Sequence, residues 1–225
     1  MRRLLFLAFI AFTLCGCKED SPSEILETGT KPSPHYITEY LVASKIDVEV
    51  NKDSGKLCLK VSGDEYTTWH KNNISEEALY FIELYNDKSY HGSVHPGMTP
   101  ALAYPLDKIT IYCDKDFDAE HPAGEPLDKI ALLYFSSYYP FIEGGYKGIH
   151  PFNYDRISYI MRFDDVNADR SKLMCAHFLT SKISPSYVAE IEFLSQPAEL
   201  GEYTFTLEMT TNGETFTTEF THTFE

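Results

Sequence analysis

The residues with the clearest chemical potential form an acidic run that directly follows a strand-like segment. They are Asp114, Asp116, Asp118, Glu120 and Glu125. They fall at positions 1, 3, 5, 7 and 12 of a loop, a spacing at which calcium-binding loops place their oxygen ligands. However, Ala119 occupies position 6, where the sharp turn of such a loop requires glycine. The spacing therefore predicts a solvated inter-strand loop, with a calcium site of another geometry as the alternative.

A second group with chemical potential consists of aromatic side chains on turn-rich segments. Between residues 134 and 154, tyrosine and phenylalanine alternate with glycine and proline. Tyrosine combines an apolar ring face with a hydrogen-bonding hydroxyl, so exposed rings could stack on sugars or bind a protein. The alternative is that the rings close the core over the end of a sheet. The candidate ligand-binding residues are Tyr138, Tyr139, Tyr146, Tyr154 and the only tryptophan, Trp69.

Motifs of the common enzyme classes are missing from the sequence. It has no G-x-S-x-G elbow, H-E-x-x-H pair, P-loop or G-x-G-x-x-G turn. His91 and His95 are four residues apart, but Gly92 and Pro96 indicate a loop and argue against a two-histidine metal site. We expect neither an enzyme nor a cofactor. A carboxylate-dependent hydrolase remains an alternative, because spacing cannot single out a catalytic pair among 34 acidic residues.

The N-terminus has the layout of a secretory signal. Arg2 and Arg3 precede an apolar run from Leu4 to Leu14. As a helix, this run would span only about 16 Å, roughly half of a bilayer's hydrocarbon core. The next residues complete Leu14-Cys15-Gly16-Cys17, which resembles the lipobox of bacterial lipoproteins. That resemblance implies removal of residues 1–16 and lipidation of Cys17.

The segment after Cys17 reads as a tether that carries an address. Lys18-Glu19-Asp20-Ser21 resembles the surface-export tag of Bacteroidetes-type lipoproteins, which implies an outer-membrane protein facing the cell exterior. Proline, serine and threonine without an apolar period predict a flexible tether over residues 17–35. The stretch from Ile109 to Leu127, with Cys-Asp-Lys-Asp-Phe-Asp-Ala-Glu-His-Pro-Ala-Gly inside it, is similar to one in a Bacteroidetes-type surface lipoprotein family of unknown function. That similarity implies a β-rich body and assigns no catalytic residue.

The charge of the chain narrows the range of partners. Loss of Arg2 and Arg3 with the signal leaves 17 basic side chains against 34 acidic ones, a net charge of −17 with histidine neutral. So acidic a surface repels nucleic acid and gives no electrostatic attraction to an anionic bilayer. The lipid is therefore the expected membrane contact. Cys58, Cys113 and Cys175 lie in apolar runs and are predicted to be buried thiols, with one disulfide as the alternative.

Period-2 alternation predicts strands through most of the body. Residues 46–50 and 57–61 alternate around a turn and form a hairpin. Further strands are expected at 109–113, 130–135, 157–163, 173–179 and 187–193. Over Ser75–Asn86 a helix cap competes with alternating Tyr80, Ile82 and Leu84, and we expect a strand.

The last strands carry the strongest local signals. Residues 203–209 and 216–224 alternate on either side of Asn212-Gly213, which fits a type I′ turn. Leu200-Gly201-Glu202-Tyr203 resembles the tyrosine corner of immunoglobulin-like and fibronectin-like domains. We therefore expect an all-β fold, an immunoglobulin-like antiparallel β-sandwich with long loops and insertions, as a single domain over residues 36–225.

Together these features favour a membrane-anchored, non-catalytic lipoprotein with a binding, adhesive or structural role and a glycan or protein ligand. The alternative is an accessory glycan-binding lipoprotein of a nutrient-uptake system. The hydrolase is the third interpretation. We expect no nucleic-acid partner.

Overall fold

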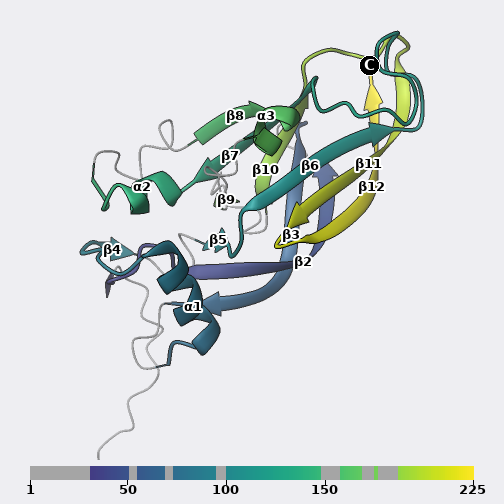
Figure 1. Cartoon of the computed structure of the whole chain (residues 1–225). Helices are drawn as coiled ribbons and strands as arrows, with labels where there is room; N and C mark the ends of the chain where they lie inside the picture. The colour runs from purple at the N-terminus through teal and green to yellow at the C-terminus, as the bar shows by residue number, and fades with distance from the viewer. Residues whose placement is uncertain are drawn as a thin grey trace, which may run out of the picture.

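The computed structural model describes residues 31–50, 55–68, 73–94, 100–147, 158–168, 175–176 and 187–225. The predicted signal, Cys17, most of the predicted tether, Trp69 and Tyr154 lie outside these ranges. Most described residues are in strands (Figure 1). None of the helices in these ranges is long and apolar enough to cross a membrane.

The strands and helices are as follows. The strands are β1 (Lys31–Pro32), β2 (Glu39–Val50), β3 (Leu57–Thr67), β4 (Ser93–Val94), β5 (Pro100–Leu102), β6 (Leu106–Cys113), β7 (Ala131–Ser137), β8 (Ser158–Arg162), β9 (Cys175–Ala176), β10 (Tyr187–Phe193), β11 (Gly201–Thr211) and β12 (Glu214–Phe224). The helices are α1 (Glu76–Tyr85), α2 (Tyr139–Glu143) and α3 (Phe163–Ala168).

Two main sheets form the body. The larger has the order β10-β3-β2-β5-β9-β7-β8, and β10 also pairs with β7, so the sheet curls into a half-barrel. It is mixed, because β2 and β5 run parallel. The smaller sheet is antiparallel, in the order β12-β11-β6, and β12 packs against β2 (Figure 1). The expected β-rich, two-sheet body is therefore present, but its larger sheet is not purely antiparallel.

The first predicted hairpin is confirmed. Ile46 lies opposite Val61, and Val48 lies opposite Leu59. A bulge between Ala43 and Lys45 interrupts this pairing. At the bulge the strands come so close that a Cβ on Gly63 would lie 1.8 Å from the carbonyl oxygen of Val42.

The predicted C-terminal turn is also confirmed. Asn212 and Gly213 have φ values of 53° and 75°, as a type I′ turn requires. Farther along the hairpin, the hydroxyl of Tyr203 donates a 2.8 Å hydrogen bond to the carbonyl of Glu199, four residues upstream. The corner therefore has the bond that the resemblance to immunoglobulin-like domains implies.

The strand expected over Ser75–Asn86 is wrong, because this segment forms α1. The Ser75 hydroxyl accepts a hydrogen bond from the backbone of Ala78 and caps the helix, which ends at Asn86 in the left-handed conformation. Residues Ala78, Phe81, Ile82 and Tyr85 are buried, at spacings of three and four. This helical stripe outweighs the short alternation, since it places four apolar side chains in one core.

The main core lies between the two sheets. It includes residues with no exposed surface from both sides, such as Ile109 and Phe205 of the smaller sheet and Leu133 and Phe135 of the larger. Cys58 and Cys113 are buried thiols in these sheets, as predicted. Cys175 lies in β9, and its side chain is outside the described part of the chain.

A second, aromatic core lies under α1 and α2. Its buried rings are Tyr36, Tyr40, Phe81, Tyr85, Tyr90, Tyr138 and Phe141. The chain enters the body beside this core: β1 pairs with β4, and Ser33 donates a backbone hydrogen bond to Gly92. The folded body therefore begins near Lys31, inside the segment predicted as a tether.

Candidate functional site

An open cleft of about 400 Å³ lies where β3, β10 and β12 come together. Its lining residues are Gly55, Lys56, Leu57, Ile191, Glu192, Phe193, Leu194, Ser195, Gln196, His222 and Phe224. Because Ile191 pairs with Leu57, the adjoining ends of β3 and β10 form one wall. The end of β12 contributes His222 and Phe224.

The apolar surface of the cleft is held in place by ring packing. Phe193 stacks on Phe205 of the main core, with ring centroids 5.0 Å apart. The His222 ring meets the edge of Phe224 at 4.7 Å, with an angle of 87° between the rings. Leu194 follows β10 and is 54% exposed, although its backbone amide is bonded to Ile130. The cleft therefore combines a rigid aromatic base with an exposed leucine at its edge.

The charges around the cleft are mostly satisfied. Lys56 forms a 2.7 Å ion pair with Glu190, and the hydrogen bond from this carboxylate raises the pKa of the lysine. The lysine also lies 5.2 Å from the centre of the Tyr134 ring. Burial lowers the pKa of His222, so this ring is neutral at pH 7. With Lys56 neutralised by Glu190, Glu192 gives the lining a negative balance.

This arrangement suits binding better than acid–base chemistry. A glycosidase-type mechanism needs two carboxyl groups that face each other across the substrate. The lining of the cleft contains only one carboxylate, Glu192. In the portion of the chain that the structure covers, no three histidine, cysteine, aspartate or glutamate side chains are grouped so that they could hold a metal ion.

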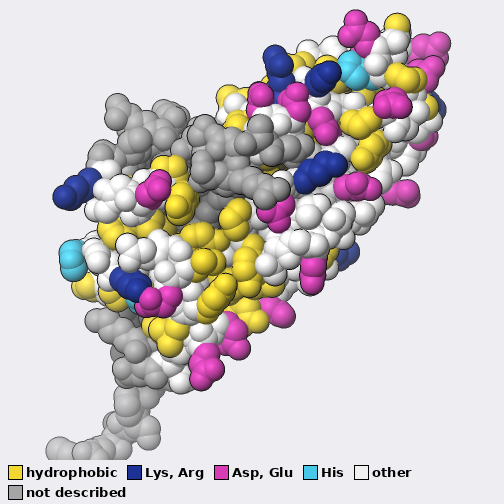
Figure 2. Space-filling view, in the orientation of Figure 1, with side chains coloured by type: hydrophobic (Ala, Val, Ile, Leu, Met, Phe, Trp, Pro, Cys, Tyr) yellow, Lys and Arg dark blue, Asp and Glu magenta, His cyan; other side chains and the backbone are white. Residues whose placement is uncertain are grey.

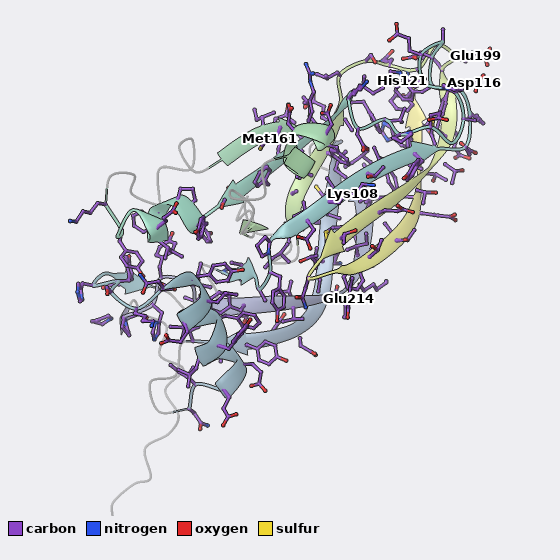
Figure 3. The ribbon with its side chains drawn as sticks, viewed as in Figure 1. Lys108, Asp116, His121, Met161, Glu199 and Glu214 are labelled. Atoms are coloured by element: carbon purple, nitrogen blue, oxygen red, sulfur yellow. The ribbon has the colours of Figure 1, made fainter. Side chains whose placement is uncertain are left out.

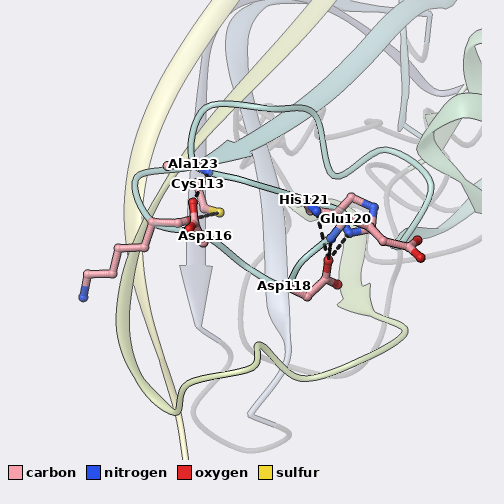
Figure 4. A network of polar contacts seen from close by, with 7 residues as sticks. Cys113, Asp116, Asp118, Glu120, His121 and Ala123 are labelled. Carbon is pink, nitrogen blue, oxygen red and sulfur yellow. Dashed lines mark hydrogen bonds and ion pairs between the residues drawn. The ribbon is translucent and has the colours of Figure 1, made fainter.

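The predicted calcium loop is built differently from a metal site. One oxygen of Asp118 accepts hydrogen bonds from the backbone of Glu120 at 2.8 Å and from the backbone and Nδ1 of His121 at 2.9 and 2.8 Å (Figure 4). Desolvation opposes ionisation of this carboxyl, but the His121 hydrogen bond outweighs it and lowers the pKa of Asp118. Asp118 therefore braces the loop.

The neighbouring carboxylates act on other groups. Asp116 accepts a hydrogen bond from the backbone of Ala123 at 2.8 Å, and Asp114 accepts one from Thr204 of β11 at 2.9 Å. Asp116, His121 and Glu199 all lie at the end of the molecule that holds the C-terminus (Figure 3). The acidic spacing therefore serves three separate braces, and the expected grouping of Asp114, Asp116, Asp118, Glu120 and Glu125 around one ion is not found.

The predicted aromatic residues have separate roles. Tyr138 is only 5% exposed, and its ring meets Tyr36 edge-on in the aromatic core. Tyr139 is half-buried beside Tyr85, and Tyr146 donates a hydrogen bond to Asp87. Trp69 and Tyr154 lie outside the described residues. Within the described part, Tyr138 does not present its ring to solvent.

The cleft itself was not predicted. Alternation placed Phe193 and His222 on strands, but their proximity depends on the pairing of β10 with β3 and on the position of β12, which no local motif reveals. In comparisons with known proteins, no family model matches the chain, and no curated protein or solved structure is significantly similar to it. The geometry of the cleft is therefore the basis for a function.

Proposed function

We propose that this protein is a non-catalytic binding protein, held to the outer membrane by lipid on Cys17, that takes a ligand into the cleft between β3, β10 and β12. The observation that carries the proposal is the cleft itself, with its apolar lining and its single carboxylate. Concave sites with mainly apolar walls and a few polar groups are typical of small-ligand binding.

The ligand class follows from the lining. Leu57, Phe193 and Phe224 suit an apolar or aromatic group. Glu192 adds negative charge, and Lys56 is already paired with Glu190, so a positive group on the ligand is favoured over a negative one. The net charge of −17 on the mature chain acts in the same direction. We infer that the ligand presents an aromatic or aliphatic group that carries a cation.

The position of the cleft agrees with an outward-facing, anchored protein. The chain enters the body at β1, near β4 and α1, whereas the C-terminus lies at the opposite end (Figure 1). Phe224, which lines the cleft, is the residue before the last one. A lipid on Cys17 would therefore hold the entry end near the membrane and direct the cleft away from it.

We also propose an immunoglobulin-like relationship for the smaller sheet. It is supported by the bond between the Tyr203 hydroxyl and the Glu199 carbonyl and by the antiparallel order β12-β11-β6. The parallel pair β2–β5 in the larger sheet departs from the two antiparallel sheets of that architecture.

The cleft is tested with two probes of opposite charge on the same ring system. Tryptamine and indole-3-acetate are titrated into the secreted Cys17→Ser chain, and backbone amide shifts are followed by NMR. We expect tryptamine to shift the amides of Leu194 and Ser195 at lower concentrations than indole-3-acetate does.

Two exposed leucines provide matched variants for this titration. Leu194→Ser should weaken tryptamine binding, whereas Leu200→Ser should leave it unchanged, because Leu200 is 60% exposed and does not line the cleft. If neither probe shifts the cleft amides, the proposal is wrong. Stronger binding of indole-3-acetate would contradict the inferred charge of the ligand.

A further inference from the structure

A set of three tyrosines far from the cleft has no part in the function proposed above. Tyr66 in β3, Tyr80 in α1 and Tyr104 just after β5 surround the ring of Phe81, and we call them the tyrosine patch. Their ring centroids lie 6.1, 5.3 and 5.2 Å from that of Phe81, respectively. Three segments distant in sequence are thus brought to one surface.

The tyrosine patch is accessible as well as packed. Tyr80 is 53% exposed, and Tyr66 and Tyr104 are half-buried. Desolvation raises the pKa of Tyr104, and the Tyr80 and Tyr66 hydroxyls raise it further, so the three hydroxyls lie near one another. Figure 2 shows apolar and aromatic side chains gathered over the region of α1. Solvent therefore meets ring surface and a group of neighbouring hydroxyls together.

The charges beside the patch discriminate between its conceivable partners. Helix α1 carries Glu76 and Glu77 in its first turn and Glu83 farther along, and it has no basic residue in its last turn. These carboxylates repel phosphate, sulfate and uronate groups, and they would lose hydration against a bilayer. They would also face each other if a second copy of this chain docked through the same surface. A neutral, hydroxyl-rich ligand meets none of these penalties.

We propose that the tyrosine patch is a binding platform for neutral sugar rings. Tyrosine ring faces accept the apolar C–H face of a sugar, and the phenol hydroxyls exchange hydrogen bonds with sugar hydroxyls. The nearby carboxylates are additional acceptors for those hydroxyls. The platform is distinct from the predicted 134–154 ring set, of which Tyr138 is buried. It is also independent of the cleft.

The test uses neutral and anionic hexasaccharides on the same protein. Maltohexaose, cellohexaose, mannohexaose and hexagalacturonate are titrated into the Cys17→Ser chain by isothermal titration calorimetry. We expect at least one neutral sugar to bind and hexagalacturonate not to bind. Tyr80→Ala should weaken the neutral sugar by about 10-fold, the magnitude of one lost aromatic contact. Tyr80→Phe should retain stacking and lose less.

Leu79→Ala is the matched control, because Leu79 is the preceding residue of α1, 47% exposed, and lies about 100° away around the helix. It should bind sugar as the parent chain does. The proposal is overturned if no neutral hexasaccharide binds at about 10 mM, if Tyr80→Ala binds undiminished, or if hexagalacturonate binds as well. Leu194→Ser keeps the result separate from the cleft, since it should not change sugar affinity. Association of the chain through the patch, detected by sedimentation and abolished by Tyr80→Ala, would also overturn it.

Discussion

The hydroxyl of Tyr146 donates a 2.7 Å hydrogen bond to the carboxylate of Asp87, a residue with no exposed surface. The same carboxylate accepts hydrogen bonds from the backbone amides of Tyr36 and Ile37, each at 2.8 Å. Asp87 follows the C-terminus of α1, and its own amide is bonded to Ile82. One buried side chain thus joins the entering chain, α1 and the segment after α2.

Removal of this carboxylate should destabilise the body. Asp87→Ala leaves two buried amides without their acceptor, and we expect the free energy of unfolding to fall by about 2–4 kcal/mol. Tyr146→Phe removes one bond and should cost about 1 kcal/mol. Urea denaturation measures both. Tyr139→Phe is the control, because its hydroxyl makes only a 3.5 Å contact with Glu143 and its loss should have little effect.

Asp87 should also give stability an unusual pH dependence. Burial raises its pKa, and the bonds from Tyr36 and Tyr146 only partly offset this effect. The folded state therefore binds the proton more tightly than the unfolded state, so stability falls as pH rises from about 4 through the folded pKa. Urea unfolding at a series of pH values should show this fall in the parent chain relative to Asp87→Asn. Parallel curves for the two chains would contradict the assignment.

Gly63 should not tolerate a side chain. A Cβ at this position would lie 1.8 Å from the carbonyl oxygen of Val42, a backbone atom that cannot move without disturbing the bulge. We expect Gly63→Ala to lower the free energy of unfolding by about 2–3 kcal/mol. Ser62→Ala, at an exposed neighbouring position, should change it little. Equal stability of the two variants in thermal unfolding would be evidence against the close approach.

The acidic loop should be stable without calcium. Its carboxylates already accept hydrogen bonds from separate groups, so the thermal midpoint should be the same in excess calcium and in EDTA. Asp118→Ala removes the acceptor for three bonds and should lower the midpoint by about 2–4 °C in either condition. A rise in the midpoint on addition of calcium, lost in Asp118→Ala, would restore the metal site.

Lipidation of Cys17 remains a prediction from the sequence and is tested on the native chain. We expect the protein to fractionate with the outer membrane and its N-terminal peptide to begin at an acylated Cys17, as read by mass spectrometry. Cys17→Ser should be released into the soluble fraction. An intact leader or an unmodified thiol at this position would remove the anchor without affecting the tests of the cleft and the tyrosine patch.

Local signals in the sequence predicted local structure well. Asn212-Gly213 specified its turn because only a few residue types adopt two consecutive positive φ angles. The alternation around Ile46 and Leu59 specified a hairpin because one face of each strand is buried. For α1, the alternation of Tyr80, Ile82 and Leu84 was misleading, since the core selects the stripe at spacings of three and four.

Long-range pairing accounts for what the sequence could not predict. Tyr66, Tyr80 and Tyr104 meet because β2 pairs with both β3 and β5 and because α1 packs on those strands. The cleft depends likewise on β10 beside β3. Asp114, Asp116 and Asp118 could be identified as polar, but a shared ion and separate backbone donors use the same residue types at the same spacing.

The way the chain enters the body has a mechanical consequence. If Cys17 is anchored, a pulling force on the molecule is applied at Lys31. From there it passes to the β1–β4 pair and to the amides held by Asp87. These bonds join the entering chain to α1 and the aromatic core, at the opposite end from the C-terminus (Figure 1). Drag on the cell surface would therefore strain the anchored end first and leave the geometry of the distant cleft undisturbed.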